Sequence, residues 1–392
     1  MWTRLALAFS LLLSLAAFAQ VDPLSNLSGT SPAVGASPWI RSGSGSLTFF
    51  HGFDIHATHL SQTGPEEQEN ATFSTNWFGA GAQLALGERA FVLGRGRISL
   101  EPYTIDDSYP QFFQYVPEDG LVDHMRPHDL FGEVAVQVGF RPTNATLLSV
   151  YGALVGQPAL GAAPAQLRAS GIDFAEAPFT YELLETTHDS TSVVTAGFAS
   201  RFFTIEASMF HDGATTGDHT ELDSGDMDSR SARLTIMPAP NLAIQVSRGE
   251  LGVEGDLPLA LQSDLTTASL TYGGPVASVT ALWSSRSFPE DDARETVTGY
   301  AVELALRASR NTFMARVEQI DRPGGFPLAP RPAQDVEGAT HYTAGYVFDI
   351  MPASRYKLGL GVNIDYRTKT RELEDVYGHK PQGIYTFVRL RS

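Results

Sequence analysis

The 392-residue chain contains no cysteine, which excludes a small scaffold held together by disulfides. Beyond its first twenty residues it has no apolar stretch long enough for a transmembrane helix, which needs roughly 20 residues. Only 18% of the residues are charged, and the formal net charge of -17 argues against nucleic acid as a partner. These absences leave a soluble protein or a membrane β-barrel.

The first nineteen residues predict a cleaved secretory signal peptide. Residues 1–4 carry a single positive charge, residues 5–16 are almost continuously apolar, and Ala17-Phe18-Ala19 fits the small-x-small pattern that a signal peptidase needs. The apolar run is too short to span a bilayer comfortably. We therefore expect cleavage after Ala19 and export of the chain.

Glycine and aromatic residues, by contrast, are abundant. The 36 Gly, 23 Phe and 13 Tyr suit many strands, tight turns and aromatic girdles. Period-two segments rich in β-branched and aromatic residues predict sixteen strands. These strands are expected near 46–58, 72–86, 91–101, 130–140, 146–156, 191–200, 202–210, 230–237, 242–249, 265–273, 276–285, 298–308, 312–320, 341–350, 355–366 and 382–390.

The predicted connections alternate between short and long. The short ones are 87–90, 141–145, 201, 238–241, 273–275, 309–311 and 351–354. Long polar links fall between them, at 59–71, 102–129, 157–190, 211–229, 250–264, 286–297, 321–340 and 367–381. Short periplasmic turns alternating with long outer loops are what an up-and-down outer-membrane barrel requires. A soluble sandwich has no reason to sort its loops by length.

Within the strands, apolar and polar residues alternate. In 202–209 the apolar face is Phe203, Ile205, Ala207 and Met209, and the residues between them are polar. One face suits lipid and the other suits a wet or hydrogen-bonded lumen. A soluble barrel would show the same alternation, so the loop pattern and the signal peptide decide between the two. The sequence therefore predicts an all-β fold, a transmembrane up-and-down antiparallel barrel of about sixteen strands.

The chain is accordingly divided into three parts. Residues 1–19 are the signal peptide, and 20–45 are a Ser-, Gly- and Pro-rich flexible periplasmic segment. Residues 46–392 form the barrel. The chain ends on Arg391-Ser392 and not on the terminal aromatic residue of many outer-membrane proteins, so Tyr385 and Phe387 are the candidates for that assembly signal.

Over residues 46–392 the chain resembles the porin-like outer-membrane β-barrel proteins of Gram-negative bacteria. The stretch 123–131, Asp-His-Met-Arg-Pro-His-Asp-Leu-Phe, also resembles an uncharacterised branch with a His-Pro-His-Asp type motif. Arg126 stands where that motif has its first histidine, so one potential ligand is missing. The resemblance implies contact with outer-membrane lipid, lipopolysaccharide and the barrel-assembly machinery, and a homo-oligomer by analogy of fold. It implies no activity.

Charged residues on the polar faces are the candidates for a pore lining. They are Arg95, Arg97, Glu101, Glu133, Glu206, Arg233, Glu303, Arg307, Arg316, Glu318 and Asp365. One interpretation is a pore whose charged walls filter small hydrophilic solutes. The other is a lumen filled by ion pairs that satisfy buried charge. The pore is favoured because a barrel of about sixteen strands usually leaves an aqueous channel. We expect the long links 102–129 and 157–190 to constrict it.

Histidines collect in the predicted outer loops and in the strand halves beside them. Imidazole is the commonest protein ligand for transition metals, which makes His124 and His128 the best candidates for a zinc or copper site. The plainer explanation is that lipid-facing positions exclude histidine, which then gathers in loops and the lumen.

An enzyme is not expected. His188-Asp189-Ser190 places three triad residue types side by side, but catalytic partners usually converge from separate segments. No G-x-S-x-G, P-loop or H-E-x-x-H motif occurs. The function that the sequence favours is a channel for passive diffusion of small hydrophilic solutes, with no cofactor. The alternatives are transport or binding of a divalent transition metal through the outer histidines, then a structural barrel, then a lipid-modifying enzyme.

Overall fold

The computed structural model describes residues 40–43, 45–63, 70–105, 108–116, 121–185, 187, 190–212, 219–222, 224–252, 262–289, 294–321, 338–351, 356–368 and 382–392. Most of these residues belong to β-strands. Within this part of the chain no helix is long and apolar enough to cross a membrane. The predicted signal peptide and most of the 20–45 segment lie outside the described residues.

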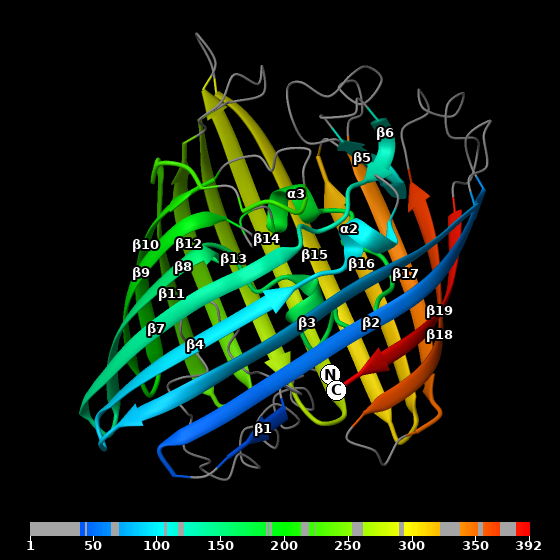
Figure 1. The fold of residues 1–392 in the computed structure, drawn as a ribbon. Helices are drawn as coiled ribbons and strands as arrows, with labels where there is room; N and C mark the ends of the chain where they lie inside the picture. The colour runs from blue at the N-terminus through cyan, green and yellow to red at the C-terminus, as the bar shows by residue number, and fades with distance from the viewer. Residues whose placement is uncertain are drawn as a thin grey trace, which may run out of the picture.

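Sixteen antiparallel strands form a closed barrel, as the sequence predicts (Figure 1). Closure is made by the last strand pairing with the first long one, in a ladder that runs from Gln382 opposite Thr63 to Arg391 opposite Asp54. The sixteen are β2 (Leu47–Thr63), β3 (Asn70–Leu86), β4 (Ala90–Ile98), β7 (Phe131–Thr143), β8 (Thr146–Val155), β9 (Thr191–Ser200), β10 (Phe203–His211), β11 (Ser229–Ala239), β12 (Leu242–Leu251), β13 (Ser263–Gly273), β14 (Ala277–Pro289), β15 (Arg294–Ala308), β16 (Asn311–Ile320), β17 (Ala339–Asp349), β18 (Lys357–Thr368) and β19 (Gln382–Arg391). A short strand, β1 (Ile40–Ser42), pairs with the start of β2.

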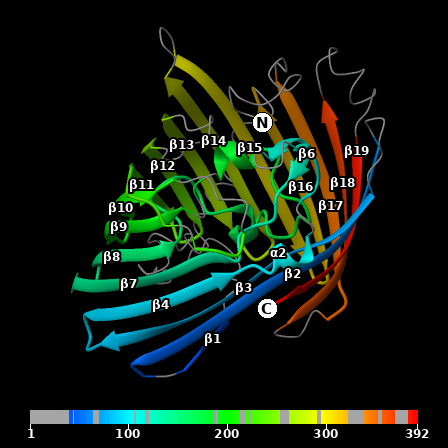
Figure 2. The same ribbon diagram turned by 45° about the horizontal axis from the view of Figure 1, so that its top comes forward.

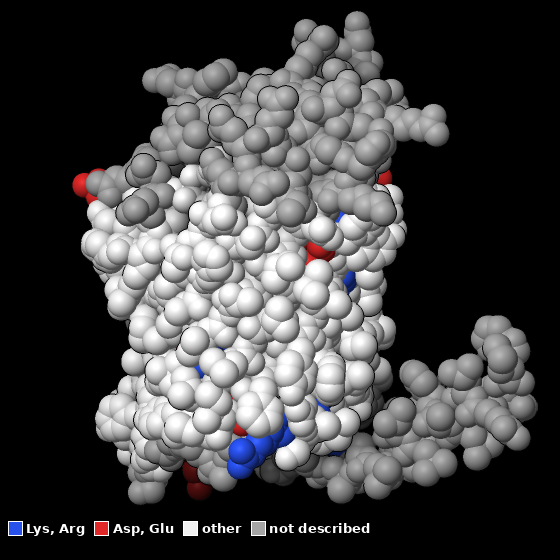
Figure 3. Space-filling model, turned by 90° about the vertical axis from the view of Figure 1, so that its right-hand side faces the viewer, with Lys and Arg blue, Asp and Glu red and all other residues white. Residues whose placement is uncertain are grey.

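The alternation along each strand decides which side chains face out. In β10, Ile205 and Met209 are 52% and 55% exposed, whereas Thr204 and Glu206 are buried. The same pattern leaves leucine, valine, isoleucine and phenylalanine side chains on the outside of nearly every strand. Figure 3 shows one side of the barrel. Few of the described residues in the middle of that side are charged. An apolar band of this kind is the surface that a lipid bilayer requires.

The short turns that the structure describes lie at the lower rim of the barrel in Figure 1. Gly87, in the turn between β3 and β4, has a φ of 71°, which glycine adopts without strain. Ser309, in the turn between β15 and β16, has a φ of 57°. These turns join strands that are consecutive in the chain and adjacent in the barrel.

Two connections predicted as long loops are largely strand. The 59–71 link is shortened because β2 runs to Thr63 and β3 begins at Asn70. The 286–297 link is shortened in the same way by β14 and β15, which extend to Pro289 and from Arg294. Ladder hydrogen bonds join backbone groups whatever the side chains are, so a hairpin continues beyond the region where apolar residues alternate.

Two long links, by contrast, fold inside the barrel. One follows β4 and contains helix α2 (Glu101–Thr104) and the hairpin of β5 (Tyr109–Val116) with β6 (Leu121–Met125). Glu101, expected at the end of a strand, therefore lies in a helix. The other link follows β8, and we call its residues 157–185 the inner segment. The inner segment contains the 3-10 turn η2 (Ala165–Leu167) and helix α3 (Tyr181–Leu184), and it lies within the barrel in both views (Figures 1 and 2).

The apolar core lies in the lumen, where the inner segment meets the barrel wall. Leu160, Phe179 and Leu183 pack with wall residues such as Phe210 and Leu265. A second cluster joins Phe174, Ala175 and Tyr181 of the inner segment to wall and hairpin residues, namely Leu60, Phe73, Tyr109, Met125 and Tyr385. The inner segment is thus packed against the wall as a protein core is packed, and it narrows the lumen.

Candidate functional site: the charged lumen

The charged residues singled out by the sequence lie on the inner face of the barrel. Their side chains come from β4, β7, β10, β11, β15, β16 and β18, and Glu101 comes from α2. Ten of them are buried, namely Arg95, Arg97, Glu101, Glu133, Glu206, Arg233, Glu303, Arg316, Glu318 and Asp365, whereas Arg307 is partly buried. A buried charge needs a partner, so the contacts of these side chains decide what the lumen can do.

Some of the charges pair from strand to strand along the wall. Arg95 on β4 donates to Glu133 on β7 at 2.9 Å, and the hydroxyl of Tyr151 donates to the same carboxylate at 2.9 Å. Arg233 on β11 donates to Glu206 on β10, also at 2.9 Å. Glu206 and Arg233 are direct neighbours in the ladder. These pairs join neighbouring strands of the wall, and Arg233 also donates to the carbonyl of Gly161 in the inner segment at 3.1 Å.

The other wall charges hold the inner segment, and Arg168 makes the first contact. Its guanidinium donates to both oxygens of Glu303 on β15, with distances of 2.6 and 3.0 Å. It also donates to Glu185, at the end of the inner segment, at 2.6 Å. A guanidinium bound by a carboxylate through two bonds is held in one orientation. Arg168 therefore joins both halves of the inner segment to β15.

Asp173 makes the second contact, with arginines from two strands. Arg391 on β19 donates to one carboxylate oxygen at 2.8 Å, and Arg389 donates to the same oxygen. Arg307 on β15 reaches the other oxygen at 3.2 Å. Burial alone would raise the pKa of Asp173, but the three guanidiniums hold it well below its ordinary range. Asp173 is therefore a permanently charged contact at neutral pH.

The third contact lies against β16 and β18. Arg316 donates to Glu176 of the inner segment at 3.2 Å. The amide of Asn363 donates to the other oxygen of that carboxylate at 2.8 Å. Burial raises the pKa of Glu176 above its ordinary value, although Arg316 opposes the shift. Nearby, the backbone and hydroxyl of Thr180 donate to Glu318 at 3.1 and 2.8 Å.

The sequence did not reveal the partners that the inner segment supplies. Arg168, Asp173 and Glu176 lie in a stretch without strand periodicity, so nothing in the pattern assigns them a direction. Arg389 and Arg391 could have been found, because they continue the inward face of β19. Tyr385 and Phe387, proposed as an assembly signal, lie on that same buried face.

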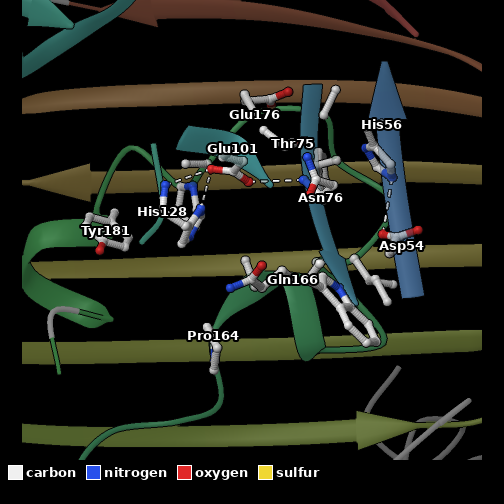
Figure 4. A pocket seen from close by; sticks show the side chains of 18 of the residues that line it. Asp54, His56, Thr75, Asn76, Glu101, His128, Pro164, Gln166, Glu176 and Tyr181 are labelled. Atoms are coloured by element: carbon white, nitrogen blue, oxygen red, sulfur yellow. Dashed lines mark hydrogen bonds and ion pairs between the residues drawn. The ribbon is translucent and has the colours of Figure 1, made fainter. Parts of the chain in front are cut away.

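A cavity of about 60 Å³ remains between the inner segment, α2 and the strands β2 and β3 (Figure 4). On one side of it Glu101 accepts hydrogen bonds from the backbone of Asn76 at 3.1 Å and of His128 at 2.8 Å. The Nδ1 atom of His128 lies 2.7 Å from the same carboxylate. On the other side of the cavity, His56 and Asp54 project from β2.

The histidines proposed as metal ligands are placed as follows. His128 lies beside Glu101, and His124 lies in β6 opposite Pro110. Across the described residues, no group of three or more His, Cys, Asp or Glu side chains is arranged to hold a metal ion. The zinc or copper site therefore stays a prediction.

The three residues considered for catalysis are only partly described. His188 and Asp189 lie outside the described residues. Ser190 is buried, and its hydroxyl donates to the carbonyl of Thr187 at 3.1 Å.

Neither protein-family models nor curated proteins give a match to this chain. Several solved structures do match this chain. An anion-selective porin from Comamonas acidovorans has a TM-score of 0.58 at 12% identity, over 88% of this chain and 99% of that one. Salmonella typhi OmpF has a TM-score of 0.58 at 10% identity, over 90% and 100%. The trimer form of Vibrio cholerae OmpT has a TM-score of 0.52 at 10% identity, over 89% and 100%. At these identities the likeness concerns the fold, and the chain has the closed sixteen-strand barrel of the outer-membrane porins.

Proposed function

We propose that this chain is an outer-membrane channel through which small hydrophilic solutes or ions diffuse passively. The observation that carries the proposal is a sixteen-strand barrel with an apolar outside and a charged lumen. The inner segment narrows that lumen while held by charged groups from several strands. A barrel that served only as a scaffold would not need charged groups around a narrowed passage, whereas a filter does.

Selectivity would depend on the balance of charge beside the passage. Acidic and basic side chains both line the lumen, which suits small polar solutes better than one class of highly charged ligand. The excess of acidic residues in the whole chain, with its net charge of -17, favours cations at the entrance. Outer-membrane lipid, lipopolysaccharide, the assembly machinery and further copies of the chain are the partners that we expect for such a channel.

If the outer face lies in a bilayer, the stability lost on placing a charge there depends on the depth of the substituted residue. Val150 lies in the middle of β8 and is 56% exposed on the outside. Val150→Arg should lower the free energy of unfolding in phospholipid vesicles by about 2–4 kcal/mol, because the charge would lie near the bilayer midplane. The matched control is Val276→Arg, in the turn between β13 and β14, where the loss should be about 0–1 kcal/mol. Equal losses at the two positions, measured by denaturant titration, would contradict a membrane-embedded outer face.

Conduction is tested by recording the refolded chain in a planar bilayer. We expect discrete conductance steps, since a barrel of about sixteen strands usually leaves an aqueous path. Zinc and copper are then added from one side, and His124→Ala/His128→Ala is the control. Block by micromolar metal that disappears in this variant would favour the alternative of a metal-transporting barrel. An inserted barrel that never conducts would refute the channel.

A further inference from the structure

The cavity beside α2 has an unusual lining. Four carboxylates reach it, from Asp54, Glu101, Glu176 and Glu185, and the described residues of its lining include no lysine or arginine. Three of the four form an ion pair with an arginine. Asp54 pairs with Arg391, Glu176 with Arg316 and Glu185 with Arg168.

Glu101 is the exception among these four carboxylates. It is 1% exposed, and its contacts are the backbone N–H groups of Asn76 and His128 and the ring of His128. A buried carboxylate without a strong cation beside it favours a positively charged ligand.

His56 gives a second, independent indication of a ligand. It is 3% exposed, and its ring stacks on Phe387 with centroids 5.1 Å apart. Its Nε2 atom lies 3.4 Å from an oxygen of Asp54 in an ion-pair contact, and no described group hydrogen-bonds either ring nitrogen. His56 lines the same cavity as Glu101. Buried polar atoms are nearly always hydrogen-bonded, so Nδ1, the ring nitrogen that does not contact Asp54, is available to a molecule in the cavity.

Four aromatic residues, Trp77, Tyr109, Phe174 and Tyr181, also belong to the lining, beside small and apolar residues of the inner segment. Aromatic rings attract cations through their negative faces. A volume of about 60 Å³ accommodates only a small group, in the range of about four water molecules.

We propose that this cavity binds an ammonium group, either the free ammonium ion or the terminal amine of a larger solute. The three or four N–H donors of such a group match acceptors that come from several directions. His56 would accept one bond through Nδ1, and Glu101 would accept another while balancing the charge. A metal ion fits less well, because the described residues hold no compact group of three ligands. The proposal is independent of conduction, since binding requires only the folded barrel.

Trp77 supplies a direct readout. In a chain whose other tryptophans are replaced by phenylalanine, we would titrate the folded barrel with methylammonium chloride and follow Trp77 fluorescence. Potassium chloride at equal ionic strength is the control for screening. We expect a saturable change with methylammonium that potassium does not reproduce. Parallel titrations with ammonium chloride and butylammonium chloride distinguish a free ion from the amine end of a larger molecule, and binding of either supports the site.

Two variants test the assigned residues. His56→Phe keeps the ring stacked on Phe387 but removes the nitrogens, and Glu101→Gln keeps the shape but removes the charge. Each should weaken methylammonium binding about tenfold, the usual effect of losing one hydrogen bond to a charged group. His56→Leu, which also lacks a hydrogen-bond acceptor, serves if the phenylalanine variant fails to fold, as judged by far-UV circular dichroism. A response that potassium matches, that both variants retain, or that micromolar zinc or calcium abolishes would overturn the proposal.

Discussion

Replacing residues 158–184 by a short glycine–serine linker should raise the single-channel conductance severalfold while the barrel still forms. The wall is a continuous ladder from β2 to β19 whose closure does not involve the inner segment. Without that segment, a barrel of about sixteen strands has a lumen wide enough for a water-filled channel. The charges freed on the wall, such as Glu303 and Arg389, would then face water and increase ion flow.

The same linker inserted between Pro240 and Asn241 is the control for the deletion. That turn joins β11 and β12 at the rim, away from the inner segment, so the conductance of this variant should equal that of the unaltered chain. Circular dichroism would verify that the deleted chain retains its strands. If the deletion leaves the conductance unchanged, the inner segment does not limit the passage, and the constriction must lie elsewhere.

Asp173→Asn should both loosen the inner segment and move the ion selectivity toward anions. The change keeps the shape of the side chain but leaves the guanidiniums of Arg307, Arg389 and Arg391 with one carboxylate fewer. Removing one partner of a buried ion pair costs about 3–5 kcal/mol, because the remaining charge is left uncompensated. The reversal potential under a salt gradient measures the shift, and thermal unfolding measures the lost stability.

An exposed ion pair supplies the control for Asp173→Asn. Glu250→Gln breaks the pair with Arg230, whose two side chains are 44% and 71% exposed, and surface pairs contribute about 0–1 kcal/mol. Glu250→Gln should change neither the reversal potential nor the thermal stability. Loss of stability of similar size in both variants would mean that the contacts of Asp173 do not hold the inner segment.

The pH dependence of this contact follows from its charge. The pKa of Asp173 is lower in the folded chain than in the unfolded chain, where an aspartate has a pKa of about 3.9. Its stabilisation is therefore complete above that value and is lost only as the pH falls toward the folded-state pKa. Acidification from pH 7 to about 5 should leave the Asp173 contacts intact. Release of the inner segment in that range, detected as a rise in conductance that Asp173→Asn abolishes, would contradict this.

The barrel could be predicted because two signals in the sequence pointed to the same fold. Alternation such as that of Ile205 with Glu206 gave the direction of the side chains, and the loop lengths gave the order of the turns. Alternation also placed Glu303 and Arg316 on the inner face. The extra length of β2 and β14 could not be predicted, because backbone pairing continues where side chains no longer alternate.

The partners of the lumen charges could not be predicted in the same way. The fold of the inner segment depends on contacts with strands more than a hundred residues away, such as Arg168 with Glu303. No local pattern encodes such a pairing. The cavity beside α2 is a consequence of the same long-range packing, since it joins His56 and Glu101 to residues of the inner segment.

The proposed channel requires that hydrophilic solutes diffuse through the lumen past the inner segment. Swelling of proteoliposomes in neutral sugars of increasing size tests it most directly, because net uptake requires an open aqueous path. We predict rapid swelling with the smallest sugars and a steep decline with size, relieved by the deletion of residues 158–184. Liposomes that contain the folded barrel but swell no faster than empty ones, with or without the deletion, would contradict the channel.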